Sequence, residues 1–255
     1  MDAFIAMAYR QLKRFLRAKP RLVFTLITPI MWIVFYGIGW ASSMNFPGIE
    51  LILGTDYLSF LIPGVVGMAV FMAGYMSGVS VIWDKHFGFL KEVLVAPTPR
   101  WQSITGRIFG DSIVAMIQGV ALALLGFLIA HNMNPWGLPI VFLASFLTAF
   151  GFASIGTAIA ASGKFKTIEG FQAFVNLVTF PVIFSSGAFF PLNNVPDWFK
   201  SIAYVNPLTY SVDAMRLALA GVGSFPMWED LLALVIFALT SGAIAAYFFE
   251  RSTLD

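Results

Sequence analysis

Cysteine and charge are what this sequence has least of. It contains no cysteine, which excludes disulfides, thiolate metal sites and cysteine nucleophiles. Charged residues make up 11% of the 255 residues, against about 25% in ordinary soluble domains. The hydrophobic share is 59% and the mean hydropathy is +0.84. A soluble enzyme would expose large apolar patches, and a disordered chain would carry more charge, so lipid is the expected solvent.

Motifs for nucleotide or metal chemistry are also missing. The stretch nearest to a Walker A motif, 158–165, ends in Gly163-Lys164 but lacks the leading glycine and the Ser or Thr that would hold magnesium. His86 and His131 have no HExxH pattern around them, so we predict neither a metal site nor an enzyme active site. The net charge of +2 gives no reason to expect nucleic acid as a partner. If the protein uses ATP, another chain must bind it.

Six long apolar segments dominate the chain. A helix needs about 20 mostly apolar residues to cross about 30 Å of hydrocarbon. The period-two alternation of β-barrel strands is absent, so we predict an all-α polytopic membrane protein with a single transmembrane domain over 1–255. The six predicted spans are residues 22–41, 58–83, 108–130, 138–162, 170–190 and 230–249.

Ionisable side chains inside these spans would point to ion or proton relays, but few are present. Asp111 lies near the start of the third span, whereas Gln118, Gln172 and Asn176 are uncharged. A proton-coupled carrier would be expected to show a membrane carboxylate without a partner. None is evident from the sequence.

Lysine and arginine are distributed unevenly between the two sides of the predicted membrane. Thirteen fall in the N-terminal segment, the loop after the second span, the turn after the fourth span and the C-terminus. The opposite side holds only Lys200 and Arg216. By the positive-inside rule, we predict a multi-pass protein of the cell membrane with both termini in the cytoplasm.

The N-terminal segment, 1–21, has the pattern of an interfacial helix. Apolar side chains between Phe4 and Leu16 share one helical face, and basic side chains crowd the other. The basic residues are Arg10, Lys13, Arg14 and Arg17. Such a helix would place its cations near anionic lipid head groups and would end before Pro20. The alternative is a basic flank that only sets the topology.

The cytoplasmic loop 84–107 has the pattern of a short docking helix. Apolar residues at helical spacing are accompanied by one lysine and one glutamate and are followed by two prolines that would end the helix. These residues are Phe89, Leu90, Lys91, Glu92, Val93, Leu94, Pro97 and Pro99. A short amphipathic helix between two long spans suits insertion into a groove on a partner protein. The alternative is a connector lying on the lipid surface.

The outer segment, 191–229, is too apolar for a free loop and too often interrupted for a span. The residues that divide it are Pro191, Pro196, Pro207, Gly221 and Gly223. Non-helical backbone at membrane depth is tolerated only where it is buried in protein or lines a cavity. We therefore predict re-entrant or interfacial half-helices that cap a pathway. The residues expected in an interfacial aromatic belt are Trp198, Tyr204, Tyr210 and Trp228.

Other patterns concern contacts between helices. Asp213 and Arg216 are three residues apart, so they can either pair on one helical face or face the pathway. Small residues four apart allow two helices to approach closely. The glycines in such pairs are Gly74, Gly78, Gly106 and Gly110. The two halves show no alignable repeat, which disfavours an internally duplicated carrier and suits a dimer.

Two stretches of the chain resemble the permeases of ABC-2 type (type V) transporters. From Trp83 the sequence reads Trp-Asp-x-x-x-Gly-x-Leu-Lys-Glu-x-Leu-Val-Ala-Pro-x-Pro-Arg, similar to the region between the second and third spans of that family. The matching outer blocks are Ser186 to Leu192, Val195 to Trp198, Asn206 to Tyr210 and Asp213 to Arg216. The likeness covers essentially the whole chain and is greatest to the daunorubicin-resistance and nodulation-factor exporter branch.

The resemblance implies the permease subunit of an ABC exporter, a transport subunit with no catalytic site or cofactor of its own. ATP and Mg would be bound by two copies of a separate ATPase subunit. A second permease copy, expected to be identical, would complete a pathway for an amphipathic drug, a lipid or a glycan. The alternatives from other classes are an ion-gradient-driven carrier or channel and a membrane scaffold.

The resemblance also implies roles for particular residues. The coupling helix received by the ATPase would use Phe89, Leu90, Lys91, Glu92, Val93, Leu94, Ala96, Pro97 and Arg100. An outer gate would be formed by Gly187, Phe189, Phe190, Pro191, Trp198, Asn206, Pro207, Tyr210, Asp213 and Arg216. The interfacial helix, with its four basic residues, would lie against the ATPase.

Overall fold

Helices are the only regular elements in the part of the chain that the computed structural model describes, residues 2–40, 49–88, 98–130, 132–165 and 167–251. In chain order they are α1 (Ala3–Arg17), α2 (Lys19–Met31), the π-helix η1 (Trp32–Ile38), α4 (Ile49–Leu53), α5 (Tyr57–Tyr75), α6 (Ser77–His86), α8 (Arg100–Gly126), η2 (Pro135–Gly137), α9 (Leu138–Ala161), α10 (Ile168–Ser185), η3 (Leu192–Asn194), α11 (Asp197–Val205), α12 (Pro207–Ala220) and α13 (Met227–Glu250). The all-α prediction is confirmed for these residues.

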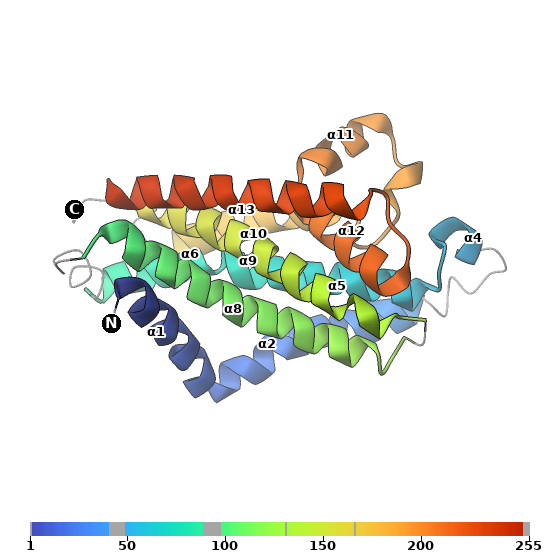
Figure 1. Ribbon diagram of the computed structural model, residues 1–255, viewed down its shortest axis with the longest axis horizontal. Helices are drawn as coiled ribbons and strands as arrows, with labels where there is room; N and C mark the ends of the chain where they lie inside the picture. Colours follow the sequence, from blue (N-terminus) through green and yellow to red (C-terminus); the bar gives the residue numbers. More distant parts are fainter. Residues whose placement is uncertain (1, 41–48, 89–97, 131, 166, 252–255) are drawn as a thin grey trace.

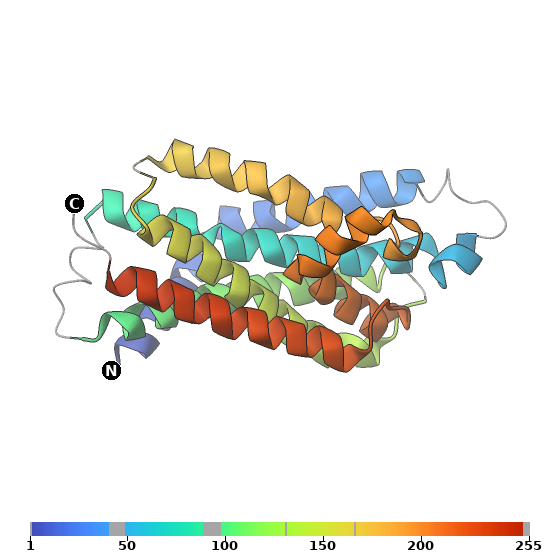
Figure 2. The ribbon, with the colours of Figure 1, turned by 90° about the horizontal axis from the view of Figure 1, so that it is seen from above.

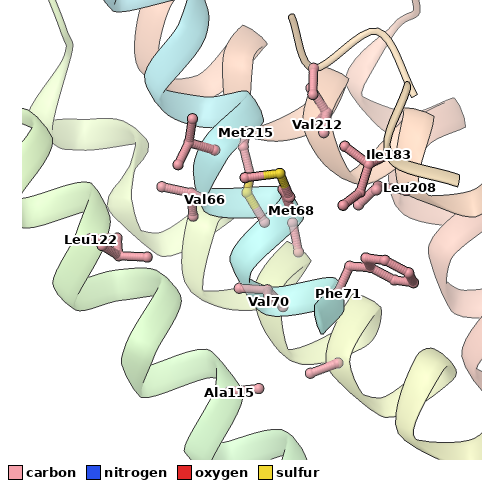
Figure 3. Packing of buried hydrophobic residues seen from close by; sticks show 14 of the residues in the cluster. Val66, Met68, Val70, Phe71, Ala115, Leu122, Ile183, Leu208, Val212 and Met215 are labelled. Atoms are coloured by element: carbon pink, nitrogen blue, oxygen red, sulfur yellow. The ribbon is translucent and has the colours of Figure 1, made fainter. Parts of the chain in front are cut away.

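The long helices form one elongated bundle with α5 at its centre (Figure 1). α1 begins and α13 ends at the same end of the bundle, and α4 lies at the opposite end. Figure 2 shows α2 and α10 along one side of the bundle and α13 along the other. Leu61, Val66 and Phe71 of α5 are completely buried. Figure 3 shows the α5 side chains packing against residues of α8, α10 and α12.

Five helical segments among the described residues are long and apolar enough to cross a membrane, which makes this a multi-pass membrane protein. They are Tyr57–His86, Arg100–Gly126, Pro135–Ala161, Ile168–Ser185 and Met227–Glu250. The predicted first span, 22–41, corresponds to a shorter apolar helix, Val23–Ile38. Pro29 lies inside α2 there, and the helix continues as the π-helical turn η1. The count of six spans therefore stays a prediction.

Two predicted boundaries differ from the structure for identifiable reasons. The third span was expected from residue 108, but α8 begins at Arg100 because polar residues of its first two turns lower the hydropathy without breaking the helix. The fifth span was expected to reach residue 190, but α10 ends at Ser185. Gly187 follows with a φ of 70°, which a residue with a side chain rarely adopts.

Short polar side chains cap the N-termini of several helices. Asp56 accepts hydrogen bonds from the Ser59 backbone N–H at 3.0 Å, the Ser59 hydroxyl at 2.7 Å and Asn132 Nδ2 at 3.0 Å. Burial alone would raise the pKa of Asp56, but the hydrogen bonds from Ser59 and Asn132 outweigh it and lower the pKa. Thr167 caps α10 through the Gly170 N–H in the same way. These caps fix where the long helices start.

The outer segment between α10 and α13 folds into η3, α11 and α12, so prolines and glycines divide it as expected. Asn206 caps α12, and Pro207 occupies its first turn. Gly221 ends α12 with a φ of 71°. The depth of these short helices in the membrane stays a prediction.

Candidate functional site

The predicted coupling helix lies almost entirely outside the described residues, which omit 89–97. The flanking helices reach further into the predicted loop 84–107 than expected, because α6 continues to His86 and α8 begins at Arg100. Arg100 donates from Nη1 to the backbone oxygen of Glu250 at 3.2 Å. The start of α8 is therefore tied to the end of α13, directly beside the predicted coupling segment.

A buried carboxylate joins the N-terminal helix to the same region. Asp84 of α6 accepts two hydrogen bonds from the Arg10 guanidinium, both at 3.1 Å, and one from Arg107 Nη1 at 2.5 Å. Arg14 Nη1 lies 4.0 Å from an Asp84 oxygen, and Arg107 also donates to the Ser80 hydroxyl at 2.7 Å. Arg107 is 1% exposed and Asp84 is 6% exposed. We call Arg10, Arg14, Ser80, Asp84 and Arg107 the Asp84 charge cluster.

α1 also packs against α8 at backbone distance. A Cβ atom on Gly106 would overlap the backbone of Phe4, and one on Gly110 would lie 2.8 Å from the Ala8 oxygen. The ring of Phe4 contacts that of Phe109, with 5.3 Å between centroids. The pair Gly106 and Gly110, predicted to allow close approach of another helix, is thus the place where α1 packs on α8.

The four basic residues predicted for α1 line one hollow together with Tyr9. Arg10 and Arg14 also belong to the Asp84 charge cluster. Lys13 lies over the ring of Tyr9, 5.3 Å from its centroid. The amphipathic helix predicted from the sequence is present, but its basic residues reach into the bundle as well as away from it. Contact of α1 with lipid or with an ATPase stays a prediction.

A cavity of about 420 Å³, here called the membrane groove, opens between α2, α5, α8 and α10. Its walls are mostly apolar, with a group of polar side chains. The apolar lining includes Phe15, Trp32, Met68, Met72, Met76, Phe180 and Ile183. The polar lining includes Gln11, Arg14, Thr25, Thr28, Ser77, Ser80, Asp111, Gln118 and Thr179. Such a lining can accept a molecule that is largely apolar and carries a few polar groups.

Asp111 is the acidic residue of the membrane groove. It accepts hydrogen bonds from the hydroxyl of Ser77 and from Nε2 of Gln11, the latter at 3.5 Å. Ser77 lies in α6 and Gln11 in α1, so this carboxylate links the groove to the two helices that the Asp84 charge cluster also joins. Pattern reasoning missed this site because its side chains come from helices far apart in the sequence.

Arg216, a predicted gate residue, is buried and forms hydrogen bonds with two other segments of the chain. Its Nε donates to the Phe60 carbonyl at 3.1 Å, and its Nη2 donates to the Gly187 and Ala188 carbonyls at 2.9 and 3.3 Å. The guanidinium also lies 3.7 Å from the centroid of the Phe60 ring. Arg216 thus ties α12 to α5 and to the turn after α10.

Asp213 has partners of its own, in the connection to α13. It accepts hydrogen bonds from the backbone N–H groups of Ser224 and Phe225 at 2.8 to 2.9 Å. No ion pair joins Asp213 to Arg216 in the described part of the chain. The pairing allowed by their spacing is therefore not formed.

The other predicted gate residues gather around the end of α10. Asn206 donates from Nδ2 to the Val182 carbonyl at 2.6 Å and to the Ser185 hydroxyl at 3.0 Å. Phe189 packs against Tyr36, with 5.2 Å between centroids, and Phe190 packs against Phe199.

Tyr210 and Trp198 lie further out. The Tyr210 hydroxyl donates to the Tyr204 carbonyl at 2.7 Å, and Trp198 is 67% exposed. None of the ten predicted gate residues is among the described residues that line the membrane groove. They form a separate outer layer, in which Pro191 and Pro207 mark breaks between helices.

Comparison with known proteins identifies a matching protein family. Residues 2–220 match the family described as ABC-2 type transporter. The putative transport permease ycf38 of Cyanophora paradoxa is 28% identical over 245 residues, covering 94% of this chain and 82% of ycf38. The inner membrane transport permease YadH of Escherichia coli K12 is 25% identical over 231 residues, covering 89% and 87%. The probable multidrug ABC transporter permease YbhR of that strain is 26% identical over 210 residues, covering 78% and 54%.

Proposed function

The chain belongs to the ABC-2 type transporter family, and we propose that it is the membrane-spanning permease subunit of an ABC exporter. The observation that carries this proposal is the family match over residues 2–220, together with relatives named transport permeases. Permeases of this family work with ATPase partners. We infer that two copies of a separate ATPase subunit bind ATP and Mg, and that this chain is not itself an enzyme. Membership of the daunorubicin-resistance and nodulation-factor branch stays a prediction.

Coupling to the ATPase is assigned to Arg100 and to the residues predicted for the coupling helix within 89–97, which join α6 to α8 in the sequence. Two sets of contacts made by these flanking helices support the assignment. The Asp84 charge cluster holds α6 against α1 and α8, and Arg100 ties α8 to α13. A force applied to the coupling segment would therefore reach four helices directly. Closure of the ATPase dimer could then bias two arrangements of the spans.

The substrate pathway is assigned to the membrane groove, completed by a second copy of the chain. The apolar and polar lining suits an amphipathic drug, a lipid or a glycan joined to lipid. The outer layer around Arg216 and Asn206 would close the pathway on the external side. In this assignment both termini are cytoplasmic and the assembly lies in the cell membrane.

The coupling assignment predicts that a double change, Glu92→Lys with Leu94→Asp, prevents ATPase binding. Charge reversal and loss of an apolar anchor would each weaken a helix-in-groove contact. The measurement is co-purification of an ABC ATPase, encoded by a neighbouring reading frame, with the tagged full chain from membranes. Glu50→Lys is the control, because it reverses the charge of an exposed residue in α4, at the other end of the bundle from α1 (Figure 1). Unchanged co-purification with the double variant would show that the coupling helix is assigned to the wrong residues.

A further inference from the structure

Asp230 is a buried carboxyl group whose oxygens have no hydrogen-bond partner among the described residues. It lies in the first turn of α13 and is 0% exposed. Asp213, also buried, differs in that three short contacts from backbone N–H groups satisfy its oxygens. Asp230 therefore stands out as a buried acid that the described structure does not compensate. The transport function proposed above assigns no role to this group.

The surroundings of Asp230 supply negative charge and no neutralising cation within the described part of the chain. Asp213 from α12 and Glu229 from α13 itself both act on Asp230 electrostatically. Tyr210 of α12 is also near, but its hydroxyl donates to the Tyr204 carbonyl. The Arg216 guanidinium is held by the carbonyls of Phe60, Gly187 and Ala188.

The other two helices packed on α13 add no charge near Asp230. α9 carries no ionisable residue, and α8 carries none after Asp111, which belongs to the membrane groove. An ionised carboxylate that is buried without a partner is strongly disfavoured, and a neighbouring carboxylate disfavours it further. The neutral acid is the form that fits this site.

We propose that Asp230 is a proton-binding site, and that one of its carboxyl oxygens carries a proton when α12 and α13 are packed as observed. Separation of α12 from α13 would admit water to this carboxyl group and favour release of the proton. Proton binding and the packing of the outer helices are then linked, because each favours the other. A buried carboxyl group without a hydrogen-bond partner, which the sequence did not reveal, thus lies at the start of α13.

The direct test is infrared difference spectroscopy of the full chain in lipid nanodiscs near pH 7, where exposed Asp and Glu side chains are ionised. The wild-type spectrum should contain the carbonyl stretch of a protonated carboxylic acid, and Asp230→Asn should lack it. Glu229→Gln, a change one residue away, should retain the band. An identical spectrum for Asp230→Asn would overturn the proposal, and loss of the band in Glu229→Gln instead would assign the proton to Glu229.

Thermal unfolding measured across a range of pH is a second test, and it does not depend on detecting the infrared carbonyl band. Under this proposal the native chain keeps the Asp230 proton at pH values where the unfolded chain, whose Asp side chains ionise at about pH 3.9, has released it. Stability therefore falls as pH rises above that point, until the native group also ionises. Asp230→Asn should make this fall shallower and raise Tm near neutral pH. A Tm of wild type alone that rises with added Na⁺ or Ca²⁺ would indicate a cation in place of the proton. Neither test involves an ATPase or a substrate, so failure here would leave the transport proposal intact.

Discussion

Replacing Asp84 with Asn would leave the buried Arg107 guanidinium without its counter-charge. Removal of one partner of a buried ion pair costs about 3–5 kcal/mol, and Arg10 would lose the same acceptor. We expect a clear drop in Tm for the purified chain and loss of protease protection of α1. The control is Asp197→Asn, which removes an exposed ion pair with Lys200 and should leave Tm unchanged.

A second variant separates charge from packing at the same position. Asp84→Asn combined with Arg107→Met removes both buried charges and should recover part of the lost stability, because Met fills a similar volume without needing a counter-charge. If the single Asp84→Asn variant unfolds at the wild-type temperature, the Asp84 charge cluster does not hold α1 in place.

Arg216 shows why residue spacing alone could not identify the hydrogen-bonding and ion-pair partners of charged residues. Asp213 and Arg216 are close enough along α12 to pair, yet each is satisfied by backbone groups of another segment. Those acceptors and donors belong to Phe60, the turn at Gly187 and the loop at Ser224, none of which a helical spacing rule considers. The residue types identified charged groups needing partners, but only the tertiary structure shows which partners they have.

Among the helices, the contact of α1 with α8 depends on a missing side chain. Gly106→Ala would place a Cβ atom into the Phe4 backbone, and such overpacking costs about 1–3 kcal/mol. We expect a lower Tm and faster amide hydrogen exchange over α1. Gly39→Ala is the matched control, because a Cβ atom there would have no described atom within 4 Å beyond its chain neighbours and the backbone of its own helix. A helical alanine there should be neutral or slightly stabilising. Equal effects of the two changes would contradict backbone contact between α1 and α8.

Much of the helical arrangement followed from hydropathy and from glycine and proline positions. Five of the six predicted spans and the broken outer segment are found where they were expected, within a few residues at most of their ends. The start of α8 was misplaced because helix formation tolerates polar residues that a hydropathy window does not. The helix that packs on Gly106 and Gly110 could not be predicted, because a pair of small residues indicates a close helix contact but does not identify the other helix. The membrane groove could not be predicted from the sequence either, because residues from six separate helices line it: α1, α2, α5, α6, α8 and α10.

On the scale of the whole molecule, the membrane groove needs a cover other than lipid. Its lining includes Asp111, Gln118 and Thr28, and such groups are unfavourable against hydrocarbon. The helices that flank it, α2 and α10, present large apolar side chains, among them Phe24 at 68% and Leu177 at 72% exposure. These helices share one side of the bundle (Figure 2). A second copy related by two-fold symmetry would cover the groove and enclose a shared pathway.

Because the chain has no cysteine, this arrangement can be tested with single-cysteine variants in native membranes. Leu177→Cys on α10 or Phe24→Cys on α2 should form cross-linked dimers with a short bis-maleimide reagent. Leu239→Cys is the control, because Leu239 is 68% exposed on α13, on the opposite side of the bundle. Cross-linking at Leu239 alone, or equally at all three positions, would contradict a dimer formed across the membrane groove. Cross-linking restricted to the α2 and α10 variants would place the groove between two copies, where a substrate could pass without meeting lipid.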